Sequence, residues 1–162
     1  MIDWVQFVDR LGCLPGTRHK LKPACSSERI HEAGARLGLL PEETRRMLLI
    51  FNGAELFVDA MPQFTLFGLS EIIQDCRKST WFIDCYTPKW RLMMNRPLDF
   101  VIGITCYDGV FVVRDCKRIC EWNNGEERWL SEDQSYEEWV EGLIKDGMNT
   151  AKELKGGIAG AR

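Results

Sequence analysis

The chain has 162 residues, of which 45% are hydrophobic and 28% charged, and its formal net charge is −3. This length and apolar content predict one domain with its own hydrophobic core. The small net negative charge gives no support to a nucleic-acid binder, because such proteins usually carry a basic face. We expect a single domain over residues 1–155 and a flexible tail over 156–162, where Gly and Ala replace the periodic pattern.

The amino-terminal third begins with apolar side chains at helical spacing over residues 2–11, which predicts a short amphipathic helix. A loop is expected over 12–27, and a weaker helical pattern follows over 28–37. The first residues lack a basic stretch followed by an apolar run, and no apolar run is long enough to cross a membrane. The sequence therefore predicts a soluble, cytoplasmic protein whose cysteines are reduced. They are Cys13, Cys25, Cys76, Cys85, Cys106, Cys116 and Cys120.

Four potential metal ligands, Cys13, His19, Cys25 and His31, recur at intervals of six residues in this third. Zinc sites usually contain two ligands two to four residues apart, and this set has no such pair. A nucleophilic Cys would need a histidine base within reach, and nothing in the sequence brings one there. We therefore predict no metal, no cofactor and no catalytic residue, and keep a zinc protein and a Cys-dependent enzyme as the less favoured alternatives.

Residues 38–57, GLLPEETRRMLLIFNGAELF, predict a helix with clear ends. Pro41 suits its first position, and Glu42 and Glu43 suit the first turn, where the helix dipole favours negative charge. Asn52-Gly53 can end it with a left-handed residue. Arg45 and Arg46 are placed to reach Glu42, and the apolar stripe consists of Leu40, Met47, Leu48 and Phe51. Adjacent glutamates point about 100° apart on a helix, so they are not expected to act as an acid/base pair.

Two short strands, Leu56–Val58 and Phe64–Phe67, are expected around Met61-Pro62, followed by a helix that Ser70 caps. Residues 79–97 predict a long irregular connection. Residues 98–131 then alternate between apolar runs and turn residues, which predicts a four-stranded antiparallel meander with turns at 107–109, 115–117 and Asn124-Gly125. Ser135 and Glu138 form a capping box at the start of an amphipathic helix.

The acidic side chains concentrate near the carboxyl end. Residues 121–146 contain nine acidic and two basic side chains, a local charge of −7. A solvated face is the plainer interpretation, and a surface that steers a basic partner is the functional one. Trp122 and Trp129 flank a turn in this segment, and tryptophan beside charge is typical of interfaces. The predicted contact residues are Trp122, Glu126, Glu127, Trp129, Glu132 and Asp133.

In this order, the motifs resemble the SUKH superfamily, which includes the fungal cell-wall assembly regulators. The resemblance is carried by LLPEETRRMLLIFNGAELF, FTLFGLSEI (64–72), DFVIGITCYDGVFVVRD (99–115), RICEW and SYEEWVEGLI (135–144), within residues 38–146. It implies an α+β fold, with a mostly antiparallel or mixed sheet flanked by helices. No family signature is found before residue 38.

The resemblance also implies a function. Bacterial members of the superfamily are largely immunity proteins that neutralise a cognate polymorphic toxin domain by binding it, and many such toxins are nucleases with basic grooves. Because their binding surface varies, no contact residue can be carried over. We expect a non-enzymatic protein-binding module, with a regulatory scaffold for a non-toxin partner as the alternative.

Overall fold

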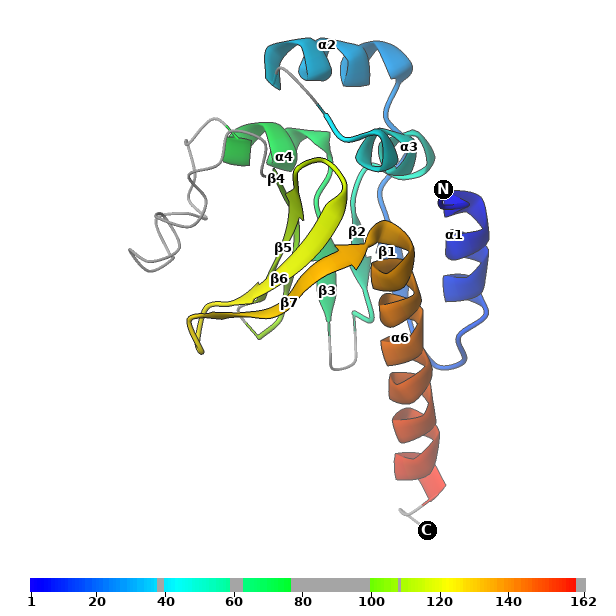
Figure 1. Ribbon diagram of the computed structural model, residues 1–162. Helices are drawn as coiled ribbons and strands as arrows, with labels where there is room; N and C mark the ends of the chain where they lie inside the picture. Colours follow the sequence, from blue (N-terminus) through cyan, green and yellow to red (C-terminus); the bar gives the residue numbers. More distant parts are fainter. Residues whose placement is uncertain (38–39, 59–62, 77–99, 108, 160–162) are drawn as a thin grey trace.

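In the computed structural model, seven strands pair in the order in which they occur along the chain, and every pair is antiparallel. The described residues are 1–37, 40–58, 63–76, 100–107 and 109–159. Helices flank this sheet, so the predicted single-domain α+β fold is confirmed (Figure 1). The strands are β1 (His19–Leu21), β2 (Ala54–Leu56), β3 (Phe64–Leu66), β4 (Phe100–Thr105), β5 (Gly109–Arg114), β6 (Arg118–Asn123) and β7 (Arg128–Ser135).

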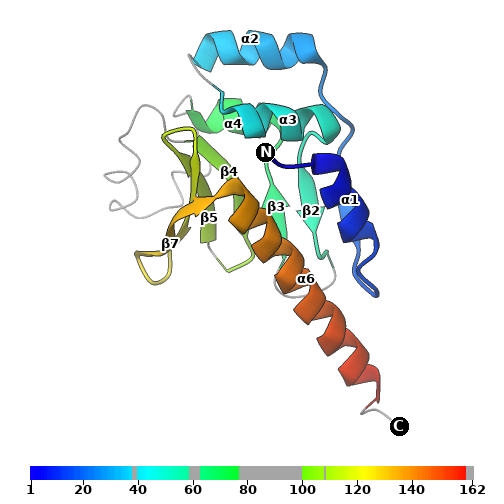
Figure 2. The same ribbon diagram turned by 45° about the vertical axis from the view of Figure 1, so that its right-hand side comes forward.

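The helices cover the sheet from one side and from one end. They are α1 (Trp4–Gly12), α2 (Ser27–Leu37), α3 (Glu42–Ile50), α4 (Leu69–Cys76) and α6 (Tyr136–Ala159). Helices α1 and α6 lie side by side, while α2 lies outermost above α3 and α4 (Figures 1 and 2). No helix in the described ranges is both long and apolar enough to cross a membrane.

Helix α3 confirms the predicted helix within residues 38–57, with different details at its ends. Pro41 is the N-cap residue and not the first helical residue, and Arg46 binds Glu43 at 3.0 Å instead of Glu42. The helix ends at an extended Phe51, with φ −147°. Gly53 does adopt a positive φ of 95°, but it does so outside the helix, where an added Cβ would lie 2.7 Å from the Gly68 nitrogen. Close approach of two backbones therefore requires this glycine.

The start of α4 is stabilised by a residue distant in sequence. Leu69 N–H donates to Asn52 Oδ1 at 2.7 Å, which satisfies one of the amides that a helix leaves free at its first turn. Ser70 lies inside the helix. The prediction that Ser70 caps α4 was therefore wrong, because a tertiary contact from the α3–β2 connection supplies the acceptor.

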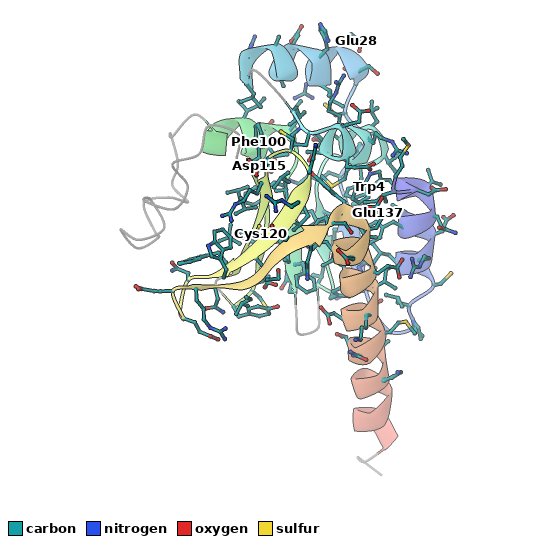
Figure 3. The ribbon with its side chains drawn as sticks, viewed as in Figure 1. Trp4, Glu28, Phe100, Asp115, Cys120 and Glu137 are labelled. Atoms are coloured by element: carbon teal, nitrogen blue, oxygen red, sulfur yellow. The ribbon has the colours of Figure 1, made fainter. Side chains whose placement is uncertain are left out.

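The predicted meander is confirmed as β4–β7, and its last strand continues to Ser135. Asp115 and Cys116 form the β5–β6 turn with φ of 51° and 58°, and Asp115 lies at the hairpin end nearest α3 and α4 (Figure 3). The β6–β7 connection was expected to be a tight Asn124-Gly125 turn. Because Asn123 pairs with Arg128, it is instead a four-residue loop, and Glu127, with φ 49°, provides its left-handed residue.

Two further differences concern the ends of the chain's regular structure. Residues 12–27 were expected to be a loop, yet they include β1, whose three residues are too few to show an alternating pattern. Helix α6 continues through residues 156–159, which were expected to belong to a flexible tail. The predicted connection 79–97 and the Met61-Pro62 pair lie outside the described residues.

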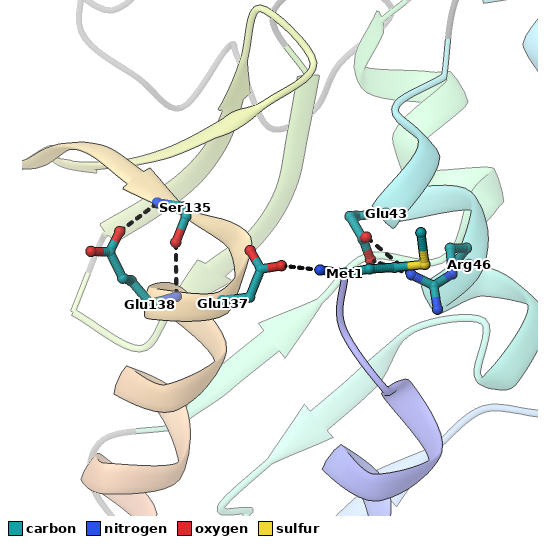
Figure 4. A network of polar contacts seen from close by, with 6 residues as sticks. All are labelled: Met1, Glu43, Arg46, Ser135, Glu137 and Glu138. Atoms are coloured by element: carbon teal, nitrogen blue, oxygen red, sulfur yellow. Dashed lines mark hydrogen bonds and ion pairs between the residues drawn. The ribbon is translucent and has the colours of Figure 1, made fainter.

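The predicted capping box is present at the start of α6. Ser135 N–H donates to Glu138 at 2.8 Å, and Glu138 N–H donates to Ser135 Oγ at 3.1 Å (Figure 4). One turn into the helix, Trp139 packs edge-on against Phe111 of β5, with ring centroids 5.4 Å apart. The capping box thus fixes where the helix begins, and the aromatic contact fixes how it meets the sheet.

Candidate partner-binding surface

The two tryptophans of the predicted contact set contribute mainly to packing. Trp122 on β6 is only 1% exposed, and Trp129 on β7 packs against it edge-on at 5.3 Å. The Arg114 guanidinium lies 4.5 Å from the centre of the half-buried Trp129 ring. Trp122 is therefore a core residue, and its prediction as a surface contact is corrected. Its position opposite Val110 of β5, a strand that is buried on both faces, explains the difference.

The predicted acidic contacts do not form one cluster. Glu126 and Glu127 lie in the exposed β6–β7 loop, at the end of the ribbon far from the start of α6, whereas exposed Asp133 lies near that start (Figure 1). Glu126 binds Arg128 at 2.6 Å, and Asp133 binds Arg118 at 2.5 Å. The side chain of Glu132 lies outside the described residues. Two of these charges are thus already neutralised within the ribbon.

The acidic residues of α6 also have partners within the chain. Glu137 binds the amino group of Met1 at 2.5 Å, close to the Glu43–Arg46 pair of α3 (Figure 4). Glu141 accepts hydrogen bonds from both terminal nitrogens of Arg10, the longer of which is 2.8 Å. Three of the nine acidic side chains of the segment therefore attach α6 to Met1 and to α1 or close its own capping box.

Glu121 and Asp146 are two carboxylates of the segment that form no ion pair with any side chain that the structure describes. Glu121 projects from β6 beside Gly109, whose absent Cβ would lie 3.2 Å from Glu121 Oε1. That oxygen is buried and has no hydrogen-bond partner in the part of the chain that the structure describes. Asp146 comes from α6, and neither carboxylate forms an ion pair among the described residues.

Tyr107, at the end of β4, lies at the same site. Its side chain is 42% exposed, and burial together with the charges of Glu121 and Asp146 raises its pKa to about 12. We use the name acidic recess for this set of residues, Tyr107, Glu121 and Asp146. They come from the turn after β4, from β6 and from α6, both carboxylates are half-buried, and the charges of the two act on Tyr107.

The acidic recess contains two carboxylates that have no cationic partner among the described residues. Burial raises the pKa of Glu121, and the charge of Asp146 raises it further. Burial likewise raises the pKa of Asp146, although Lys145 beside it acts in the opposite direction. Two desolvated carboxylates near each other favour any cation that enters, because the cation reduces their repulsion and replaces lost water. The charge of the acidic recess therefore complements that of a lysine or arginine side chain.

Glu121 and Asp146 belong to the acidic segment 121–146, but neither is among the contact residues predicted from the sequence. One pattern could have identified Asp146, because it lies three residues after buried Leu143 and four before buried Thr150, on the apolar side of α6. Glu121 lies between two buried residues of β6, so alternation placed it on the opposite face. Only the fold brings the two side chains together.

The four possible zinc ligands near the amino terminus are not gathered. Cys25 is buried, Cys13 and His31 are exposed, and both ring nitrogens of His19 have hydrogen-bond partners. In the described ranges no three Cys, His, Asp or Glu side chains are grouped so that they could hold a metal ion. The structure thus gives no geometric support to the zinc alternative.

An apolar groove of 380 Å³ lies between α1 and α3, beside the ion pairs of Figure 4. Its lining includes the exposed side chains of Val5, Leu49 and Ile50. Arg46 in this lining is paired with Glu43, and Asp3 accepts a hydrogen bond from Gln6 N–H, so the rest of this surface is mainly apolar. It differs in character from the acidic recess.

No protein-family model matches this chain, and no curated protein sequence matches it. The residues and geometry described above therefore carry the functional argument.

Proposed function

We propose that this protein is a non-catalytic, cytoplasmic protein-binding module that neutralises a cognate toxin domain by binding it directly. The order of motifs that resembles the SUKH superfamily supports this class of function. The acidic recess supports a basic partner, such as a nuclease-type toxin domain whose catalytic groove is lined with lysine and arginine.

The uncompensated pair of Glu121 and Asp146 is the observation on which this proposal rests. In a free protein, a buried carboxylate oxygen without a hydrogen-bond partner costs stability. A partner that inserts a cation would satisfy that oxygen and relieve the repulsion between the two carboxylates. Such a site is less favourable alone than in a complex, which is the arrangement expected of a binding residue. It also accounts for why Glu126, Asp133, Glu137 and Glu141 have ion-pair partners within the chain whereas these two carboxylates have none among the described residues.

Affinity capture from the native host tests the proposal. Three tagged proteins would be compared by mass spectrometry: the wild type, the double variant Glu121→Gln/Asp146→Asn, and the control Glu32→Lys on the exposed face of α2. We expect the wild type and the control to retain the same basic toxin domain, and the double variant to lose it. The amide substitutions keep size and remove charge, so the loss would report on charge and not on folding.

The alternative is a regulatory scaffold that engages a host protein unrelated to toxins. The same capture experiment distinguishes the two functions, because the identity of the retained protein differs. A toxin gene with a variable carboxy-terminal domain directly upstream would also support immunity. Retention of a host protein that the double variant still binds would contradict both the toxin partner and the acidic recess.

A further inference from the structure

The imidazole of His19 lies between β1, the preceding turn and the end of β2. Phe57 N–H donates to Nδ1 of this ring at 3.3 Å, and Thr17 Oγ1 lies 3.1 Å from Nε2. The Phe57 ring also packs edge-on against the imidazole, with centroids 4.9 Å apart. One histidine therefore connects the chain at residue 17 to the chain at residue 57.

These contacts assign the protonation state of His19. Nδ1 accepts a hydrogen bond, so it carries no proton. The Thr17 hydroxyl donates to Leu14 O at 2.9 Å, so its oxygen is left to accept from Nε2–H. The ring is thus the neutral tautomer protonated at Nε2. Burial lowers the pKa of His19, and the Leu11 carbonyl partly offsets this effect.

Phe57 makes this contact costly to lose. It has a φ of 58°, a left-handed conformation that is strained for a bulky residue and persists only when its surroundings hold it. Its ring is fully buried, and an added Cβ on Gly147 of α6 would lie 2.5 Å from it. The His19 ring supplies the acceptor for the amide of this strained residue.

We propose that His19 is a pH-sensitive latch that holds the first residue of β1 against Phe57 and releases it when the imidazole is protonated. A proton on Nδ1 would face the Phe57 N–H, so the hydrogen bond would be replaced by repulsion between two donors. The released part is confined to one end of β1. At the other end, Lys22 N–H donates to Gly53 O at 2.9 Å and does not involve the histidine.

No charged side chain is among the causes that shift the pKa of His19. Burial is the largest cause, and it lowers the pKa. Lys20 on the same strand binds Glu55 of β2 at 3.0 Å. Arg18 directly precedes His19, and α1, whose Leu11 carbonyl acts on the imidazole, carries Asp9 and Arg10.

Nuclear magnetic resonance of the whole chain tests the latch. We expect His19 to titrate below the ordinary pKa of histidine, with the Phe57 amide shift following the His19 titration. As the pH falls through that titration, protection against hydrogen exchange, corrected for the intrinsic rate at each pH, should fall at least tenfold at Phe57 and at Val58, whose N–H donates to Arg18 O. Protection at Lys22 should not change.

The variant His19→Asn removes the titrating group. In this variant, the protection of the Val58 amide should no longer change over the pH range in which His19 titrates. If His19 titrates at or above the ordinary pKa of histidine, or if Phe57 and Val58 show no change through the His19 titration, the latch is overturned. Should the Asn variant fail to fold, the wild-type titration alone still decides between these results.

Discussion

Asn52 Oδ1 accepts the amide hydrogen of Leu69 at 2.7 Å, so the residue that follows α3 and its C-cap provides the first acceptor for α4. Gly53 and Gly68 allow this contact, because an added Cβ on Gly68 would collide with the Asn52 carbonyl oxygen. The relationship gives a physical reason why the stretches 38–57 and 64–72 occur together in one sequence. Each supplies half of a single junction.

Replacement of Asn52 by alanine should therefore destabilise the protein by about 1 kcal/mol, the usual cost of losing an N-terminal helix acceptor. Asn52→Asp, which keeps an oxygen at that position, should lose less. Chemical denaturation of the two variants beside the wild type measures the difference. Equal losses would show that the hydrogen bond with Leu69 does not stabilise α4.

Two glycines of α6 should respond in opposite directions to alanine. Gly147→Ala places a methyl group 2.5 Å from Phe57 and 2.7 Å from Leu14, and overpacking of this kind costs on the order of 1–3 kcal/mol. Gly142 has open space around its missing side chain, so Gly142→Ala should stabilise the helix by about 0.5–1 kcal/mol. Thermal unfolding compares them. A stabilised Gly147→Ala would mean that α6 does not pack closely at Phe57.

The buried hydroxyls of Thr44 and Tyr136 lie 2.9 Å apart and join α3 to the first turn of α6. Tyr136→Phe should cost about 1–3 kcal/mol, because it leaves the Thr44 hydroxyl without this partner. The double variant Thr44→Val/Tyr136→Phe should cost less than the sum of its two single variants, since no polar group is then left unpaired. Strict additivity in urea unfolding would exclude an interaction between the two hydroxyls.

The acidic recess predicts a pH effect on stability. The folded pKa values of Glu121 and Asp146 are raised, so the folded state binds more protons than the unfolded state between the unfolded and folded values. Their contribution to stability is therefore present below the unfolded pKa values and is lost as pH rises through the folded ones. Glu121→Gln should raise the unfolding temperature at pH 7 and change it much less at pH 4. A variant that is less stable at pH 7 would argue against uncompensated charge.

The sequence identified the elements whose pattern is local and long enough to read. The meander, the α6 capping box and the helix at 42–50 follow from alternation, turn residues and caps within a few positions of one another. The acceptor at Asn52, the three-residue strand β1 and the buried position of Trp122 depend on contacts between distant segments. The acidic recess depends on such contacts too, because Glu121 and Asp146 are brought together by the packing of α6 on the sheet.

Calorimetric titration of the captured partner domain into the wild type, Glu121→Gln/Asp146→Asn and Glu32→Lys tests whether the acidic recess binds the partner. We expect the double variant, although at least as stable as the wild type at pH 7, to bind at least tenfold more weakly and with a smaller dependence on salt, while Glu32→Lys binds as the wild type does. Unchanged affinity and unchanged salt dependence in the double variant would contradict this expectation.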